Sequence, residues 1–402
     1  MSKKKKLPIG SDQFAKVREL GQYYVDKTML VAEFLESPDE EVTLITRPRR
    51  FGKTMNMTMM REFFDCTKDS KAMFDGLAIM ETEYASEINT KPVIFFSFKG
   101  CTGTTKEELC AKLTVELLSA YSQYFQLIQA PDCDFQRMYE LLKSRKTTHI
   151  DLSPALVVLV RAANHHFGKY PLLLIDEYDQ PIMSSYEHGY RKELGEFFAN
   201  FYGDALKGCA EAGRAVLTGI QRVAKESIFS KLNNISVFTV ADKKYSGHFG
   251  LTHEETQALL EYYDLSLTKE VTDMYDGYNF TGTRMFNPWS VTRYADTKKL
   301  EPYWVNTSTN ALIKEILGES PLHFKQRFDT LLTEGNVVTS ADLDTSYAEL
   351  QSEETLWGLL VNAGYVTIEA TIQTASDVFI LRIPNDEARK EFVGLIESYT
   401  CA

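Results

Sequence analysis

The sequence predicts an α/β domain with a mainly parallel sheet and flanking helices, followed by a helical region and a small α+β module. Three observations predict this order. Apolar runs of strand length recur in the first half of the chain, segments of helical pattern alternate with them, and the pattern changes after residue 250. Continuous apolar runs are typical of strands buried on both faces, as in parallel sheets covered by helices.

The strands of the α/β domain are expected where short apolar runs are followed by turns. These runs are Val42–Thr46, Val93–Phe98, Leu172–Ile175, Ala215–Gly219 and Ile235–Val240. The clearest helical segments between them are Thr54–Phe64, Lys106–Tyr121 and Tyr190–Lys207. We therefore place the α/β domain at residues 20–245, after an N-terminal tail and lead-in segment at residues 1–19.

Helix-start signals dominate the next part of the chain. Thr252 and Glu255 have the spacing of a capping box, in which each side chain bonds the other residue's backbone amide. Asn287 followed by Pro288 also indicates a helix start, with Asn as the cap and Pro at the first helical position. We predict a helical lid region over residues 246–335.

The last part, residues 336–402, is predicted to be a winged-helix-like module. Ser352 is placed to cap its first helix, and Gly364 to end it. The expected elements are, in order, a helix at Glu353–Asn362, strands at Tyr365–Ile372 and Val378–Ile383, and a helix at Asp386–Ser398.

Composition restricts the partners of the protein. The chain has 44 Lys and Arg against 56 Asp and Glu, so its formal net charge is 44 − 56 = −12. General coating of nucleic acid is not expected, because phosphate binding depends on Lys and Arg. No run approaches the roughly 20 apolar residues that a membrane helix needs, so no membrane association is expected.

The location is expected to be cytoplasmic. The basic run Lys3–Lys6 is followed by no apolar stretch, so a secretory signal is not indicated. The six cysteines include no CxxC pair, and their spacing indicates neither a zinc site nor a disulfide framework. We interpret them as reduced thiols.

A phosphate-binding loop is predicted where the first strand ends. Gly52-Lys53-Thr54 follows the apolar run and precedes a helix, which is the ending of a P-loop or Walker A motif. Backbone amides at the helix start would bind phosphates, Lys53 would reach the β- and γ-phosphates, and the Thr54 hydroxyl would bind Mg²⁺. The residues expected to contact the nucleotide are Arg49, Arg50, Phe51, Gly52, Lys53, Thr54 and Met55.

The loop departs from the general P-loop pattern at its start. The first Gly of G-x-x-x-x-G-K-[ST] would stand at position 47, where this chain has Arg47. The three arginines Arg47, Arg49 and Arg50 could add contacts to phosphates, or they could face a partner surface or solvent.

A second motif strengthens the P-loop interpretation. Four apolar residues lead to Asp176, as in a Walker B strand that delivers a carboxylate to the Mg²⁺ shell. Glu177 comes next and is placed to polarise the attacking water. The competing interpretation is two ordinary buried strands that end in charged turns.

Three further residues are candidates at the same sheet edge. Thr218 ends a predicted strand and could sense the γ-phosphate or orient water, or it could be a simple strand-end hydroxyl. Arg222 could approach the phosphate or the site of a neighbouring subunit, or lie on the surface. Asp179 could orient nearby Arg or Lys groups, or cap the segment that follows.

Several stretches together resemble one family. They are Leu7–Gly10, Tyr23–Thr28, Leu44–Thr54, Leu174–Asp179, Thr218–Ile220, Leu232–Asn234, Asn287–Ser290, Tyr303–Ser308 and Gly364–Thr367. With them the chain resembles the bacterial AAA-ATPase-like family, a branch of the P-loop NTPases related to archaeal-type and STAND ATPases. The resemblance implies a P-loop NTPase fold with ATP and Mg²⁺ as ligands. The family's own loop begins with Arg, as here at Arg47.

The resemblance also raises the question of nucleic acid. Family members commonly carry a C-terminal PD-(D/E)XK nuclease-like domain after a segment like Arg382–Asn385, and we expect that domain to be absent from these residues. From Phe328 to Leu381 there is no Lys or Arg. Direct DNA binding by the winged-helix-like module is therefore not expected. A protein partner or self-association through this module is the preferred interpretation.

The sequence leads to one preferred function and two alternatives. The preferred function is an ATP-binding protein that hydrolyses ATP with Mg²⁺ as a conformational switch or motor. The alternatives are a nucleotide-binding scaffold with little turnover and the ATPase part of a nuclease-associated system.

Overall fold

The computed structural model describes residues 4–128, 131–222, 233–304, 320–344, 352–373 and 377–400. Contacts group the chain into two units. The sheet unit comprises Thr28–Ile45 and Thr54–Val237, and the C-terminal unit comprises Met1–Lys27, Thr46–Lys53 and Phe238–Ala402. The loop Thr46–Lys53 thus groups with residues from both ends of the chain.

The sheet has five strands in the order β2-β3-β4-β1-β5. Their bounds are β1 Val42–Thr46, β2 Val93–Ser97, β3 Leu172–Asp176, β4 Ala215–Gly219 and β5 Ile235–Phe238. The pairs β2–β3 and β3–β4 are parallel, with Ser97 opposite Asp176. The predicted α/β class with a parallel sheet is confirmed, and all five predicted strands are present.

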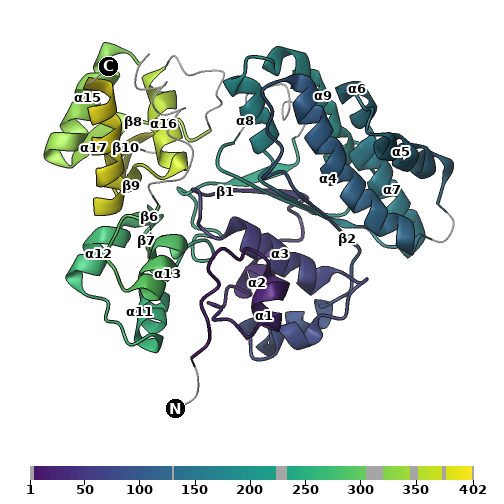
Figure 1. The fold of residues 1–402 in the computed structure, drawn as a ribbon, viewed down its shortest axis with the longest axis horizontal. Helices are drawn as coiled ribbons and strands as arrows, with labels where there is room; N and C mark the ends of the chain where they lie inside the picture. Colours follow the sequence, from purple (N-terminus) through teal and green to yellow (C-terminus); the bar gives the residue numbers. More distant parts are fainter. Residues whose placement is uncertain are drawn as a thin grey trace. The chain divides into compact units, whose positions relative to one another are not determined.

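Helices cover both faces of this sheet (Figure 1). Helices α2 and α3 lie on one face, and α4, α7 and α9 lie on the other. The helices of this unit are α2 Met29–Leu35, α3 Lys53–Phe64, α4 Lys106–Leu127, α5 Cys133–Ser144, α6 His149–Leu152, α7 Ala155–Phe167, α8 Gln180–Glu187 and α9 Arg191–Leu206. Short 3-10 helices occur at Lys71–Phe74, Ala78–Glu81 and Glu83–Glu87. Side chains of the strands and of α4 to α9 share one buried core, which includes Phe96, Leu117, Leu159 and Leu173.

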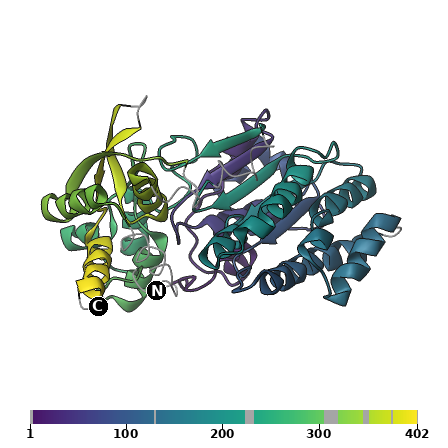
Figure 2. The same cartoon turned by 90° about the horizontal axis from the view of Figure 1, so that it is seen from above.

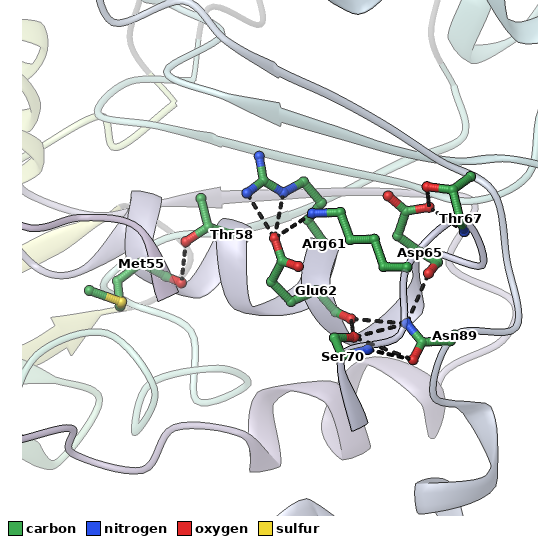
Figure 3. A network of polar contacts seen from close by, with 9 residues as sticks. Met55, Thr58, Arg61, Glu62, Asp65, Thr67, Ser70 and Asn89 are labelled. Carbon is green, nitrogen blue, oxygen red and sulfur yellow. Dashed lines mark hydrogen bonds and ion pairs between the residues drawn. The ribbon is translucent and has the colours of Figure 1, made fainter. Parts of the chain in front are cut away.

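Polar contacts fix the C-terminal end of α3 (Figure 3). The side-chain amide of Asn89 and the hydroxyl of Ser70 both donate to the carbonyl oxygen of Glu62. The Glu62 carboxylate accepts from Arg61 and Lys68, at 2.8 and 2.6 Å. Late carbonyls of a helix lack partners within the helix, so these side chains satisfy one of them. The other end of this anchored helix carries Thr54.

The C-terminal unit begins its helical part as the sequence predicts. Its elements up to residue 297 are α1 Phe14–Glu19, α11 His253–Tyr262, α12 Lys269–Tyr275, β6 Tyr278–Phe280, β7 Thr283–Met285 and α13 Pro288–Thr297. The capping box of Thr252 and Glu255 is present, and the Asn287 side chain accepts from the amides of Trp289 and Ser290. Both predicted helix starts are confirmed. The two-stranded hairpin β6–β7 is an addition that the sequence interpretation did not contain.

The last elements include one strand more than predicted. They are α15 Leu322–Glu334, β8 Asn336–Ser340, α16 Glu353–Ala363, β9 Thr367–Gln373, β10 Val378–Arg382 and α17 Asp386–Thr400. The helix–strand–strand–helix order is confirmed, as are the Ser352 cap and the left-handed Gly364 at the end of α16. Strand β8 pairs antiparallel with β10 and makes a sheet of order β8-β10-β9. In Figure 2 the β9–β10 hairpin extends beyond the helices of this module.

Two further expectations concern the surroundings of the protein. No helix in the described ranges is long and apolar enough to cross a membrane. Five of the six cysteines fall in these ranges, and each is a free thiol. Cys401 lies outside them, and the cytoplasmic location stays a prediction.

Candidate functional site

Asp176 is the centre of a polar cluster at the end of β3. Its side chain is fully buried. One carboxylate oxygen accepts from the hydroxyls of Thr54 at 2.7 Å and Ser97 at 3.2 Å, and the other accepts from the hydroxyl of Thr218 at 2.7 Å. Burial of a carboxylate is costly unless hydrogen bonds compensate it, and these three donors do so.

The cluster brings together residues from four elements of the sheet unit. Thr54 comes from the first turn of α3, Asp176 from the end of β3 and Thr218 from β4. Ser97 joins them because it lies opposite Asp176 in the parallel β2–β3 register. The sequence interpretation missed Ser97, since a serine at the end of a strand belongs to no motif. Ser97 could have been found as the polar residue that follows the apolar run Val93–Phe96.

The ligand set of this cluster suits a hard cation. Its side chains offer only hydroxyl and carboxylate oxygens, which are the protein ligands that Mg²⁺ prefers. Thr54 and Asp176 also hydrogen-bond to each other directly. The residues therefore fit the predicted roles of Thr54 and Asp176 as the groups that would hold Mg²⁺.

Glu177 has an unusual backbone. Its φ is +52°, in the left-handed region that non-glycine residues seldom occupy. The turn is fixed by hydrogen bonds from the Tyr178 amide to the Thr218 carbonyl and from the Gln180 amide to the Glu177 carbonyl. Strained backbone that is held by its surroundings occurs preferentially at functional sites. A partly buried carboxylate is thereby presented directly after Asp176.

Asp179 joins the turn after β3 to the turn after β4. One of its carboxylate oxygens accepts from the amides of Ile220 and Gln221, at 2.8 and 2.9 Å. It makes no side-chain cap bond to α8, which it precedes. A Cβ on Gly219 would lie 2.7 Å from the Asp179 carboxylate, so the two turns are in close contact. Arg222 follows the turn that Asp179 holds, and its side chain is partly buried.

The Lys53 side chain folds back onto the loop that precedes it. Its ammonium donates to the carbonyl oxygens of Arg47 at 2.9 Å and Pro48 at 3.0 Å. Gly52 has a φ of +85°, which only glycine adopts without strain. The loop that leads to Thr54 therefore encloses a buried cation.

Arg47 is a structural residue of the C-terminal unit. Its side chain is fully buried, and it donates to the carbonyl oxygens of Thr46 at 2.8 Å and Phe238 at 3.0 Å. The guanidinium lies over the rings of Phe249 and Phe280, at 5.5 and 5.4 Å from their centroids. Of the alternatives open for this arginine, exposure to solvent or to a partner surface is excluded.

The other residues predicted to contact the nucleotide differ in the accessibility of their side chains. Phe51 is fully buried, with Tyr278 and Phe280 against its ring at 4.8 and 5.5 Å between centroids. It can therefore reach a ligand only through its backbone. Arg49, Arg50 and Met55 are partly exposed, so their side chains are accessible.

The Tyr23–Thr28 stretch is also structural in part. The Lys27 ammonium donates to the Gly247 carbonyl at 2.8 Å and pairs with Glu255 at 2.5 Å. Burial lowers the pKa of Lys27 below its ordinary value. Glu255 is the capping-box residue of α11, so Lys27 ties the N-terminal segment to that helix. Of the other stretches that carry the family resemblance, Leu232 and residues 305–308 lie outside the described residues.

Comparison with known proteins identifies the family of the chain. A family model described as "Predicted AAA-ATPase" matches residues 8–229, which is more than half of the chain. An uncharacterized protein in the vnfD 5′ region of Azotobacter chroococcum mcd 1 is 29% identical over 391 residues. The alignment covers 96% of this chain and 69% of that relative.

Proposed function

Because the chain belongs to the predicted AAA-ATPase family, we propose that it binds ATP and hydrolyses it with Mg²⁺ as a conformational switch or motor. Family membership implies nucleotide binding. The observation that supports the rest is the 2.7 Å hydrogen bond from the Thr54 hydroxyl to the buried Asp176 carboxylate, directly after the loop that encloses Lys53.

The loop and the start of α3 would bind the phosphates. The backbone amides around Gly52 and Thr54 lie at a helix N-terminus, where amides and the helix dipole favour anions. Lys53 would contribute a positive charge to the β- and γ-phosphates, and the partly exposed guanidinium groups of Arg49 and Arg50 would add to it. Met55 would contact the nucleotide from the first turn of the helix.

Magnesium would be held by Thr54 and Asp176. Bound there, the ion would neutralise charge on the β- and γ-phosphates. Ser97 and Thr218 would keep the Asp176 carboxylate in place through the hydroxyl contacts already present.

Hydrolysis would depend on Glu177. Its carboxylate would accept a proton as a water oxygen bonds to the γ-phosphorus in line with the departing β–γ bridging oxygen. Thr218 would orient the water, and Arg222 would stabilise negative charge on the phosphates. The left-handed backbone of Glu177 supports this role, because it fixes the direction in which the side chain leaves the main chain.

The test is the ATPase activity of Glu177→Gln. We expect a loss of at least about a hundredfold in kcat, since general-base catalysis typically contributes that much. The binding of Mg-ATP should be retained. Glu196→Gln is a matched control, because Glu196 is exposed on α9. Wild-type turnover in Glu177→Gln would refute the assigned role.

A nucleotide-binding scaffold with little turnover is the second candidate function. It is favoured by Arg47, which is buried where P-loops usually begin with a flexible glycine. Binding of ATP without measurable turnover in the wild-type protein would support it over the switch or motor.

The C-terminal module is proposed to contact protein rather than DNA. It covers residues 336–402, and it follows the helical lid that we assign to 246–335. Its first helix, α16, starts with Glu353 and Glu354, which suit the helix dipole but repel phosphates. A gel shift with duplex DNA should therefore show no binding by this chain.

A further inference from the structure

Arg50 is held differently from the other residues of its loop. Its guanidinium lies over the ring of Trp289, at 4.2 Å from the centroid. The guanidinium makes no hydrogen bond to any residue that the structure describes. All of its N–H donors are therefore unused within that part of the chain, where a cation–π contact and electrostatic attraction hold the guanidinium.

The neighbours of Arg50 in the loop are anchored more firmly. Arg47 is hydrogen-bonded and buried between rings, and Phe51 is buried against Tyr278 and Phe280. Pro48 packs so closely on Gly364 that a Cβ there would lie 2.8 Å from the proline ring. Arg50 is thus a weakly held cation in a firmly held loop.

Glu387, in the first turn of α17, attracts Arg50 without binding it. The two charges are close enough for each to shift the pKa of the other. The Glu387 carboxylate already accepts from the Ser290 hydroxyl and from the amides of Tyr303 and Trp304, at 2.6 to 2.9 Å. Arg50 can therefore leave without removing a hydrogen bond from Glu387.

A phosphate would compete well for such a guanidinium. Arg forms paired, charge-assisted hydrogen bonds with phosphate oxygens, which are stronger than stacking on an aromatic ring. Arg50 stands only three positions before Lys53 in the same loop. Partial burial of Arg50 also removes water from it and lowers its pKa, so a new set of acceptors is favourable.

Resting on the proposed ATP binding, the geometry points to Trp289 as a positioning residue that holds Arg50 in the free protein and releases it to the nucleotide phosphates. Helix α13, which carries Trp289, and helix α17, which carries Glu387, then lose a cation whenever nucleotide binds. Nucleotide binding at the loop would thereby change the charge next to two helices of the C-terminal unit, because Arg50 moves away from them.

The test uses the tryptophan emission of the full chain during titration with Mg-ATP, with binding measured independently by equilibrium dialysis. The wild type should change its emission as it binds, because a cation leaves the Trp289 ring. Trp289→Phe should bind within about threefold of wild type and lose the change, since Phe still offers a face for Arg50. Arg50→Lys should bind about tenfold more weakly and show a reduced change.

The matched control is Arg293→Lys. Arg293 also lies over Trp289, at 5.8 Å, but it belongs to α13 and not to the loop. Its variant should keep the wild-type emission change. Binding without an emission change, a change that survives in Trp289→Phe, or a full change in Arg50→Lys would overturn the inference alone. Absence of Mg-ATP binding in the wild type would overturn both the proposed function and this inference.

Discussion

The stabilising effect of the hydrogen bonds to Asp176 can be measured by comparing two buried threonines of the same sheet. Thr218 on β4 and Thr43 on β1 are both fully buried. The Thr218 hydroxyl donates to the Asp176 carboxylate at 2.7 Å, whereas the Thr43 hydroxyl has no partner among the described residues. A hydrogen bond to a buried charge should stabilise the fold, while a buried hydroxyl without a partner should not.

We therefore predict opposite effects of replacing each threonine by valine, which has the same shape. Thr218→Val should lower the free energy of unfolding by about 1.5–3 kcal/mol, because Asp176 loses a donor. Thr43→Val should leave it unchanged or raise it slightly. Urea denaturation of both variants measures this difference. Equal effects would mean that the Asp176 cluster does not stabilise the fold.

Glu387 predicts a pH dependence of stability. Burial raises the pKa of its carboxyl from 4.5 to about 7, although the amides of Trp304 and Tyr303 and the Ser290 hydroxyl oppose the shift. The folded state thus keeps a proton that the unfolded state releases. This contribution to stability is fully present below about pH 4.5, is lost as the pH rises to about 7, and amounts to about 3 kcal/mol.

Glu387→Gln should remove this component of the pH dependence. Its amide oxygen can accept the two backbone hydrogen bonds, and its amino group can donate to the rotatable Ser290 hydroxyl. Unfolding free energies of wild type and variant between pH 4.5 and 8 provide the measurement. Glu369→Gln, at an exposed position on β9, should keep the wild-type slope. An unchanged slope in Glu387→Gln would contradict the burial argument.

Among the elements, the glycines that end two helices differ in their contact with the loop Thr46–Lys53. Helices α15 and α16 end in left-handed glycines, Gly335 with a φ of +84° and Gly364 with a φ of +87°. A Cβ on Gly335 would meet only the tip of Arg389, at 3.9 Å, whereas one on Gly364 would strike the Pro48 ring. The two sites therefore share backbone strain but differ in packing.

Alanine at each glycine separates these two effects. Gly335→Ala should cost about 1 kcal/mol of stability, from the left-handed backbone alone. Gly364→Ala should cost about 1–3 kcal/mol more, because the loop at Pro48 must move away. Thermal or urea unfolding compares them, and equal losses would show that the contact with Pro48 does not hold the loop. The extra loss should be accompanied by weaker Mg-ATP binding.

For the molecule as a whole, binding of Mg-ATP should raise the free energy of unfolding. A ligand that binds only the folded state stabilises it by about 2.7 kcal/mol at a hundred times its Kd. Mg-ATP should therefore raise the melting temperature of the wild-type protein. Lys53→Met should lose this shift, since its ammonium would no longer meet the phosphates. Lys192→Met, at an exposed position on α9, should keep it. A retained shift in Lys53→Met would contradict the assigned role of Lys53.

Local signals made most elements predictable. The five strands are short apolar runs, and the capping residues Thr252, Asn287 and Ser352 mark helix starts by chemistry that operates over three or four residues. Strands β6, β7 and β8 were not predicted, because their short sequences mix polar and apolar residues and form no continuous apolar run. They are stabilised by pairing with segments that the sequence does not place beside them.

Local pattern was enough to predict the class of the sheet, the family resemblance and the candidate residues Lys53, Thr54, Asp176 and Glu177. The contacts of Asp176 with Ser97 and Thr218, the burial of Arg47 among aromatic rings and the position of Arg50 over Trp289 became visible only in the folded chain. Each of these contacts joins segments far apart in the chain. Their partners are set by strand order and packing, which no single stretch of sequence encodes.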